Sequence, residues 1–262
     1  MAITVPTSQA WATFTADTTV TIPTTQQGDR IWIFAVWKDF AVTAAISGWT
    51  ELVEVADGAV STGNGTGSIK VGAWYLDRGG SAPSNPTLDI TGAQALIGGV
   101  CVVVARKDSG DTWDTPLQTS QAHTLNTTGQ SVQAGTELAV PNGSVVFGVL
   151  GVRDDSTTFT RDPDEGLSHD PSSGTLIWNG NVVELPATHL NTTTGNDLSG
   201  DVVHRFVTTG DTVALRQAAI LSASESGIAL WVVQSVTSAP ATPNLPFSPN
   251  VVRQSVNRSF IL

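Results

Sequence analysis

The chain is poor in cysteine, with Cys101 alone among 262 residues. One cysteine cannot form an intramolecular disulfide, which excludes the disulfide frameworks of small secreted proteins. Cys101 lies in the apolar run 99–105, where a small buried hydrophobic residue is a better interpretation than a reactive thiol. Residues 1–9 have neither a basic segment nor a hydrophobic segment of signal-peptide length, so we expect synthesis in a cytosol without oxidative folding.

Charged residues are also scarce, and basic residues are fewer than acidic ones. Charged residues make up 13% of the chain, and 23 acidic against 12 basic residues give a formal net charge of -11. This balance disfavours binding to phosphate backbones and to anionic lipid, so we expect neither nucleic acid nor a membrane as a partner. Because 40% of the residues are hydrophobic, the chain can still form a sizeable core.

Signatures of catalysis are missing as well. There is no Gly-x-Ser-x-Gly elbow, no phosphate-binding loop and no dinucleotide fingerprint, and nothing marks a pair of catalytic carboxylates. The histidines are too widely separated for a zinc site; they are His123, His169, His189 and His204. We therefore predict that the protein is not an enzyme and has no catalytic residues, cofactor or bound metal.

Two groups of acidic residues raise the question of a cation site. The segment 161–170 contains Asp162, Asp164, Glu165, His169 and Asp170, and a second group contains Asp108, Asp111 and Asp114. The first group lacks the alternating ligand spacing of a calcium loop. Aspartate is also an ordinary turn residue, so solvated turns are the favoured interpretation of both groups.

Four stretches are apolar on both alternating faces: 31–36, 100–105, 145–152 and 228–233. They are too short to span a membrane and too rich in β-branched residues for helices. Strands of this kind usually have both faces covered, which requires more cover than one partner sheet provides. We expect that cover to come from loops or from another subunit, and this favours a packing, assembling protein over an enzyme.

Turn-forming residues separate short β-prone runs throughout, which predicts an all-β fold, a β-sandwich or jelly-roll-like domain over 1–237. The expected strands are 12–14, 18–22, 30–37, 50–55, 68–75, 87–90, 95–105, 136–139, 144–152, 175–178, 202–208, 212–221 and 227–236. The polar segments 154–173 and 186–201 are interpreted as long surface loops.

The chain contains a weak internal echo. In each instance a turn with a glycine, Gly28 or Gly143, precedes an apolar strand that ends in a basic-acidic step. Two explanations are open: a duplication with halves near 1–125 and 126–237, and a chance similarity of the kind that β-strand sequences often show. Either way we expect one unit.

Eight tryptophans accompany a single tyrosine. In the run 31–37, Ile31 and Trp37 share one face with the other odd positions, whereas Trp32 and Val36 share the opposite face, and one face is expected to be core. Six further tryptophans are Trp11, Trp49, Trp74, Trp113, Trp178 and Trp231. Core or interface packing is the favoured role for these, with sugar-stacking platforms as the minority interpretation.

The segment 238–262 is predicted to form an extended C-terminal arm. It contains Pro240, Pro243, Pro246 and Pro249 and ends in an apolar tripeptide that is costly to leave in water. Two interpretations remain open, docking on a neighbouring subunit and docking on the chain's own domain. Our candidate assembly residues are Pro249, Val251, Val252, Phe260, Ile261 and Leu262.

The first half carries a recognisable order of motifs. These are Gly28-Asp29 before an apolar strand, Ser47-Gly48-Trp49-Thr50 closing a loop, the apolar strand 68–75, and Ala105-Arg106-Lys107-Asp108 before Asp114-Thr115-Pro116. Over about 27–116 this order resembles a β-sandwich family common among virion proteins of tailed bacteriophages. In the Ser-Gly-Trp-Thr turn, Gly48 can supply a tight conformation and Trp49 can seal the end of the sandwich. The second half departs from the pattern, apart from the echo at 143–155.

The resemblance implies a non-catalytic structural protein of the virion, made in the host cytoplasm. Our first expectation is a capsid decoration or head-spike protein that forms a homo-oligomer, a trimer or other multimer, and contacts the major capsid protein or other virion proteins. The alternative is a tail component, or a receptor-binding module that contacts a host-surface glycan through 154–173 and 186–201 beside Trp178. A hydrolase is a third hypothesis, for which no residues can be named.

Overall fold

The computed structural model contains strands as its only regular elements within the residues that it describes. These are 3–38, 42–57, 69–91, 97–123, 132–133, 138–153, 160–161, 183–184, 190–191, 198–207, 211–213, 216–217, 219–220 and 226–238. The prediction of an all-β protein is confirmed, and every ladder between these strands is antiparallel. Within these ranges no helix has the length and hydropathy to cross a bilayer.

The first sheet is formed by the N-terminal part of the chain. Its order is β1 (Ile3–Ser8), β9 (Gly98–Lys107), β4 (Arg30–Lys38), β7 (Ile69–Asp77) and β6 (Thr50–Asp57), with the short β2 (Ala12–Phe14) also paired to β9. The central strand β4 is the apolar run around residues 31–36, and its β-branched and aromatic side chains suit a strand that is covered on both sides.

The second sheet repeats this order with the later part of the chain. It runs β11 (Leu117–His123), β22 (Ser226–Gln234), β14 (Val145–Arg153), β18 (Leu198–Phe206) and β16 (Val183–Glu184), with β17 (Leu190–Asn191) also paired to β18. The five main strands of each sheet can be numbered along the chain, with the short β2 and β17 left out. In both sheets their order in space is then first, fifth, second, fourth, third. The second sheet begins at Leu117, before residue 125, where we expected the two halves to meet.

The turns that precede β4 and β14 are equivalent in detail. Gly28 has a φ of 88° and its N–H donates to the carbonyl of Arg78 at 2.9 Å, whereas Gly143 has a φ of 78° and donates to the carbonyl of Val207 at 2.7 Å. The N–H groups of Arg78 and Val207 each donate back to the residue after the glycine, both at 2.8 Å. A positive φ at the third position of a four-residue turn suits glycine.

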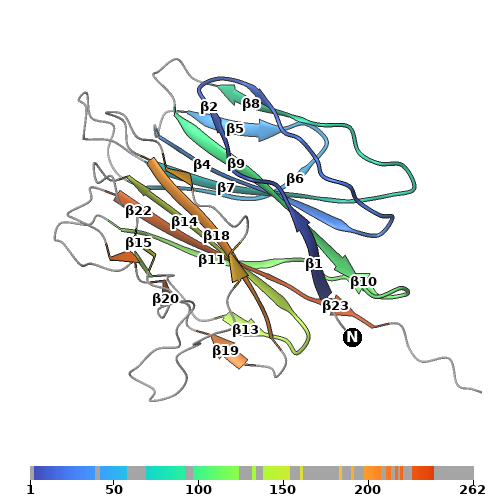
Figure 1. Cartoon of the computed structure of the whole chain (residues 1–262). Coiled ribbons are helices and arrows are strands. Elements are labelled where there is room, and N and C mark those ends of the chain that lie inside the picture. Colours follow the sequence, from blue (N-terminus) through green and yellow to red (C-terminus); the bar gives the residue numbers. More distant parts are fainter. Residues whose placement is uncertain are drawn as a thin grey trace, which may run out of the picture.

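The two sheets pack face to face, with β6 against β11, β7 against β22 and β4 against β14 (Figure 1). Because the order of strands reverses between the facing sheets, an approximate twofold axis along the strands relates them. Their shared inner core includes Trp32, Phe34, Val36, Phe147 and Leu230. The fold is therefore sandwich-like, and each sheet comes from one continuous part of the chain.

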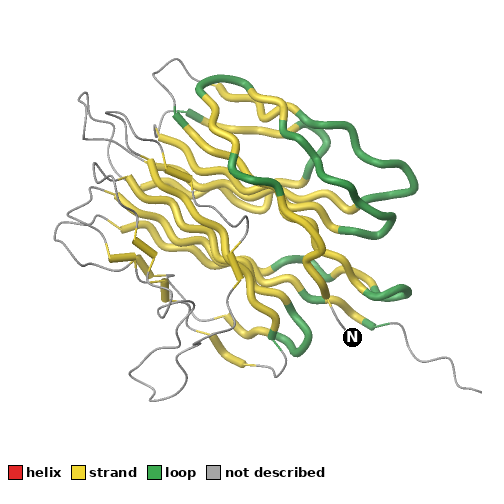
Figure 2. The backbone as a smooth tube through the Cα atoms, in the orientation of Figure 1, coloured by secondary structure: helices red, strands yellow, loops and turns green. Residues whose placement is uncertain are grey.

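The outward face of the first sheet is covered by a third layer. This outer sheet has three short strands, in the order β3 (Thr18–Thr19), β8 (Thr87–Thr91) and β5 (Thr43–Ile46), and it lies above the first sheet in Figures 1 and 2. The outer core that it encloses includes Ile31, Ile33, Trp37, Trp74 and Leu88. Both faces of β4 are thus core, which confirms the expectation that both faces of 31–36 are covered and corrects the narrower one of a single core face. The cover comes chiefly from strands of the same chain, not from loops alone or another subunit.

The remaining strands form two-stranded ladders: β10 (Thr112–Trp113) with β23 (Val236–Thr237), β12 (Val132–Gln133) with β20 (Arg216–Gln217), β13 (Leu138–Val140) with β19 (Asp211–Val213), and β15 (Thr160–Arg161) with β21 (Ala219–Ile220). The single strand expected at 212–221 is therefore three short ones.

The segment 186–201 is not a continuous surface loop, which corrects the sequence-based interpretation. Leu190 lies in a strand and is 3% exposed, and β18 already begins at Leu198. A Cβ on Gly99 would lie 2.4 Å from the Leu190 side chain, so the absence of a side chain at Gly99 makes room for this leucine in the inner core. Because the neighbours of Leu190 in the sequence are polar, the sequence pattern does not show that this leucine belongs to the core.

Candidate functional site

The assembly residues expected from the sequence lie outside the described residues. Pro249, Val251, Val252, Phe260, Ile261 and Leu262 belong to 239–262, and Trp178 and the acidic residues 162–170 are likewise outside the described ranges. Two places stand out, a buried polar network at one end of the sheets and a surface hollow at Trp49.

The polar network centres on Arg30, the first residue of β4, whose side chain is 4% exposed. Its guanidinium makes a bidentate pair with Asp77, with Nε to Oδ1 at 2.6 Å and Nη2 to Oδ2 at 2.8 Å. Nη1 donates to Gln234 Oε1 at 2.6 Å and to the carbonyl of Asp114 at 2.8 Å. Arg30 thus connects the first sheet to the last strand of the second.

Asp114 extends the network along the edge. Its carboxylate accepts from the hydroxyls of Ser235 at 2.6 Å and Thr237 at 2.7 Å. The Gln234 amide donates to the carbonyls of Asp114 at 3.1 Å and Ser235 at 2.7 Å, which satisfies a side chain with no exposed surface. A buried polar group without such partners would be costly, so these bonds hold the end of β22 in one position.

A second ion pair lies beside the first. Arg106 donates to Asp29 through Nε at 2.8 Å and Nη2 at 3.0 Å, and Asp29 is 1% exposed. The hydrogen bond with Asp29 raises the pKa of Arg106, against a smaller opposing effect of desolvation. The Trp113 indole N–H donates to the carbonyl of Gly28 at 2.8 Å. The charged groups at this end therefore bind one another and the backbone, which indicates a structural role.

Asp108 and Asp111 lie in a turn, as the sequence predicts. The N–H of Asp111 donates to the Asp108 carbonyl at 3.3 Å, and Gly110 between them has a φ of 92°. Within the part of the chain that the structure describes, no cluster of three or more histidine, cysteine or acidic residues could hold a metal ion.

Cys101 lies in the inner core and is 1% exposed. Burial raises the pKa of its thiol well above the ordinary value, and the nearby carboxylate of Asp201 raises it further. A thiol that resists ionisation is a poor nucleophile, so the interpretation of Cys101 as a small buried hydrophobic residue fits its surroundings.

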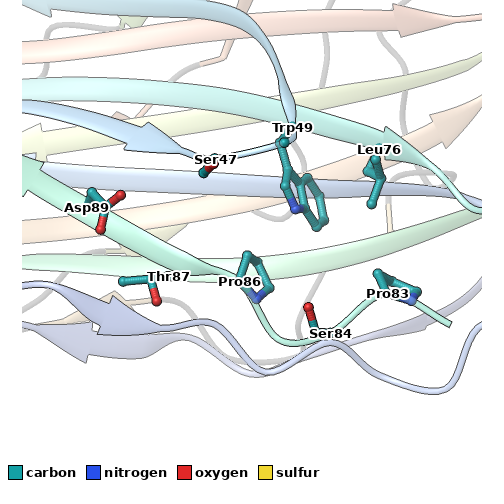
Figure 3. A pocket seen from close by; sticks show the side chains of 9 residues that line it. Ser47, Trp49, Leu76, Pro83, Ser84, Pro86, Thr87 and Asp89 are labelled. Atoms are coloured by element: carbon teal, nitrogen blue, oxygen red, sulfur yellow. The ribbon is translucent and has the colours of Figure 1, made fainter.

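The hollow lies where the outer sheet meets the end of β7. It has a volume of about 440 Å³ and is lined by Ser47, Gly48, Trp49, Leu76, Pro83, Ser84, Pro86, Thr87 and Asp89. Figure 3 shows the indole of Trp49 projecting toward the segment that carries Pro83, Ser84 and Pro86. The opening is bordered by both apolar rings and polar side chains.

The wall at Trp49 is built by a tight turn. The Trp49 N–H donates to the Ile46 carbonyl at 3.2 Å, and Gly48 has a φ of 79°. Trp49 is half-buried and packs against the outer core. The expectation that Gly48 supplies the tight turn agrees with its φ, whereas Trp49 packs against the outer core and not between the two sheets of the sandwich.

The opposite wall was not foreseen from the sequence. It consists of the segment between β7 and β8, which is fixed by hydrogen bonds from the N–H of Val20 to the Pro86 carbonyl at 2.8 Å and from the N–H of Ile22 to Asn85 Oδ1 at 2.9 Å. Pro83 and Pro86 mark this segment as a rigid connection in the sequence, but not as a partner of Trp49.

Comparisons of the chain with protein-family models, curated proteins and solved structures give no match.

Proposed function

We propose that this chain is a structural protein of a tailed-bacteriophage particle, made in the host cytoplasm. Within that class we favour a capsid decoration or spike protein that forms a multimer and binds the major capsid protein or other virion proteins. The order of motifs over 27–116 supports the class, and its Ser-Gly-Trp-Thr turn adopts the tight conformation that we expected.

The order of motifs over 27–116 carries the proposal, and the described core, which is complete within one chain, fits it. The first sheet is covered by the second sheet on one face and by the outer sheet on the other, and Trp32, Phe34 and Trp37 have no exposed surface. Such a subunit can fold before it assembles, because its central strands need no second copy for cover. Contacts with neighbours are then left to edges and to the arm.

The charged groups support the same conclusion. Arg30 and Asp29 have bidentate partners in Asp77 and Arg106 and lie at one end of the sheets. These two pairs lie within the first sheet, whereas the bond from Arg30 Nη1 to Gln234 Oε1 at 2.6 Å links that sheet to the second. Together they fix the end of the sheets, which suits a protein that must present a constant surface to its neighbours.

The arm is proposed as the assembly element. Its prolines favour an extended chain, and Phe260, Ile261 and Leu262 offer apolar side chains for a neighbouring subunit. Deletion of 249–262 should prevent incorporation into particles while the strands still fold, as judged by circular dichroism and thermal unfolding. Normal incorporation of the shortened chain would overturn the role of the arm.

The alternative is a tail component or a receptor-binding module. The hollow at Trp49 favours this alternative, because a half-exposed tryptophan beside free hydroxyl groups is suited to binding a ligand. Labelling of intact particles with an antibody against this chain separates the two locations, since the label would decorate heads in the first case and tails in the second.

A further inference from the structure

We propose that the hollow at Trp49 binds a neutral pyranose unit of a carbohydrate. The site differs from the one named for the receptor-binding alternative, at Trp178, and it does not depend on where the protein is located in a particle. The shape of the hollow, its aromatic wall, its polar rim and its charge all match such a ligand.

The apolar part of the hollow matches one face of a sugar ring. A pyranose presents C–H groups on its flat faces and hydroxyls at its edge, so it can lie on an indole while its rim stays polar. Trp49 offers that indole, with Pro83 and Pro86 on the facing wall (Figure 3). An amphipathic aromatic ring gives a large contact area at little entropic cost.

The polar part offers hydrogen-bonding groups around that platform. The Asp89 carboxylate and the hydroxyls of Ser47, Ser84 and Thr87 line the hollow. None of these four side chains, nor the indole N–H of Trp49, has a hydrogen-bond partner among the described residues. They are therefore available to a ligand, and a carboxylate can accept from two neighbouring sugar hydroxyls.

The charge of the hollow selects among sugars. Among the described residues, Asp89 is the only ionisable one that lines the hollow, and the chain as a whole carries a formal charge of -11. An acidic sugar would meet a carboxylate with no cationic group in the lining to balance it. The volume of about 440 Å³ falls within the roughly 300–1,000 Å³ of small-molecule sites. A neutral hexose or N-acetylhexosamine unit is the ligand class that fits.

The walls are held in place without a ligand, which reduces the cost of binding. The Gly48 turn fixes Trp49, and the hydrogen bonds to Pro86 and Asn85 fix the opposite segment. On the Asp89 side, the N–H of Ile90 donates to Asp17 Oδ1 at 2.8 Å. The side chains that would contact the sugar thus come from two separate parts of the chain, 47–49 and 83–89, in a fixed arrangement.

The test uses the full chain on an array of neutral oligosaccharides built from hexoses and N-acetylhexosamines, with sialylated oligosaccharides alongside. Retained sugars are then titrated by calorimetry against the wild type, Trp49→Leu, Asp89→Asn and the control Glu51→Gln. Glu51 is an exposed carboxylate on β6 that does not line the hollow. We expect binding of a neutral sugar that falls at least tenfold in the first two variants and is unchanged in the control.

Three results would overturn the proposal: a blank array, retention of sialylated sugars alone, or affinity for a neutral sugar that survives both substitutions. Trp49 packs against the outer core, so its replacement can disturb folding, whereas Asp89 is exposed and its replacement tests the site independently. Incorporation of the chain into particles is measured separately, so failure of sugar binding leaves the structural role unaffected.

Discussion

Trp32 in β4 and Phe147 in β14 occupy equivalent positions of the two sheets and contact each other, with ring centroids 5.9 Å apart and planes inclined by 52°. Each is the third residue of its strand and has no exposed surface. Contact between equivalent residues is what a twofold axis produces at an interface between identical subunits. Within one chain, it indicates that the two sheets pack as the halves of an internal dimer.

This contact predicts a large loss of stability on Phe147→Ala. The ring centroid of Phe147 also lies 5.7 Å from that of Phe34, so removal of the Phe147 ring leaves a cavity in the inner core. We expect the free energy of unfolding in urea to fall by about 3–5 kcal/mol. Phe206→Ala on β18 is the matched control, because Phe206 is 39% exposed and should cost about 1 kcal/mol or less. Equal losses in the two variants would contradict the packing.

The equivalent turns predict equivalent costs. Gly28→Ala and Gly143→Ala each place a side chain at a positive φ, which should lower the free energy of unfolding by about 1–2 kcal/mol. Gly79→Ala is the control, since Gly79 has no positive φ and a Cβ there would meet nothing within 4 Å. If the substitution at either turn left the free energy of unfolding unchanged, as in the control, it would contradict the positive φ at that turn.

The network predicts that Arg30 cannot be replaced by a side chain of similar length. Arg30→Met should lower the free energy of unfolding by about 2–4 kcal/mol, because Gln234 and the Asp114 carbonyl lose a donor in a buried place. Arg30→Lys should recover only part of that loss, since one ammonium cannot reproduce the bidentate contact with Asp77. Lys107→Met, at the end of β9, is the control for removal of a positive charge. If it lowered the free energy of unfolding as much as Arg30→Met does, the result would contradict the network.

Cys101 predicts how stability depends on alkaline pH. The pKa of the folded thiol is raised above its ordinary value of 9.0, so the folded protein retains a proton that the unfolded chain loses. Ionisation of the thiol therefore does not affect the free energy of unfolding below about pH 8. As the pH rises above 9, it lowers that free energy by up to about 1.4 kcal/mol per pH unit.

The measurement for this prediction is urea unfolding of the wild type and Cys101→Ala between pH 7 and pH 10.5. The difference in free energy between the two proteins should be constant at first and then shift in favour of the alanine variant. A constant difference over the whole range would mean that the folded thiol titrates like the unfolded one.

The long central strands are the part of the fold that the sequence predicts well. Strands at 30–37 and 144–152 were expected, and the structure has Arg30–Lys38 and Val145–Arg153. Unbroken runs of β-branched and aromatic residues leave few other structures for these segments. The strand β11, Leu117–His123, was missed because its composition is polar, and it is defined by its backbone pairing with β22 at the edge of the sheet.

The candidate sites were predictable only in part. The Ser-Gly-Trp-Thr motif indicates a turn and a half-buried tryptophan, but nothing local shows that the segment from Pro83 to Asp89 faces it. The bond from Arg30 to Gln234 joins residues 204 positions apart, and it exists because β4 of the first sheet begins where β22, the last strand of the second sheet, ends. Such contacts follow from the packing of sheets, which local sequence does not specify.

The central claim is that 1–238 forms a self-contained subunit and that the arm assembles it. Light scattering of the purified full chain, alongside a chain that ends at Ser238, tests it most directly. We expect a defined multimer for the full chain and a monomer with unchanged thermal unfolding for the shortened one. The same number of subunits for both chains, whether one or several, would contradict this claim.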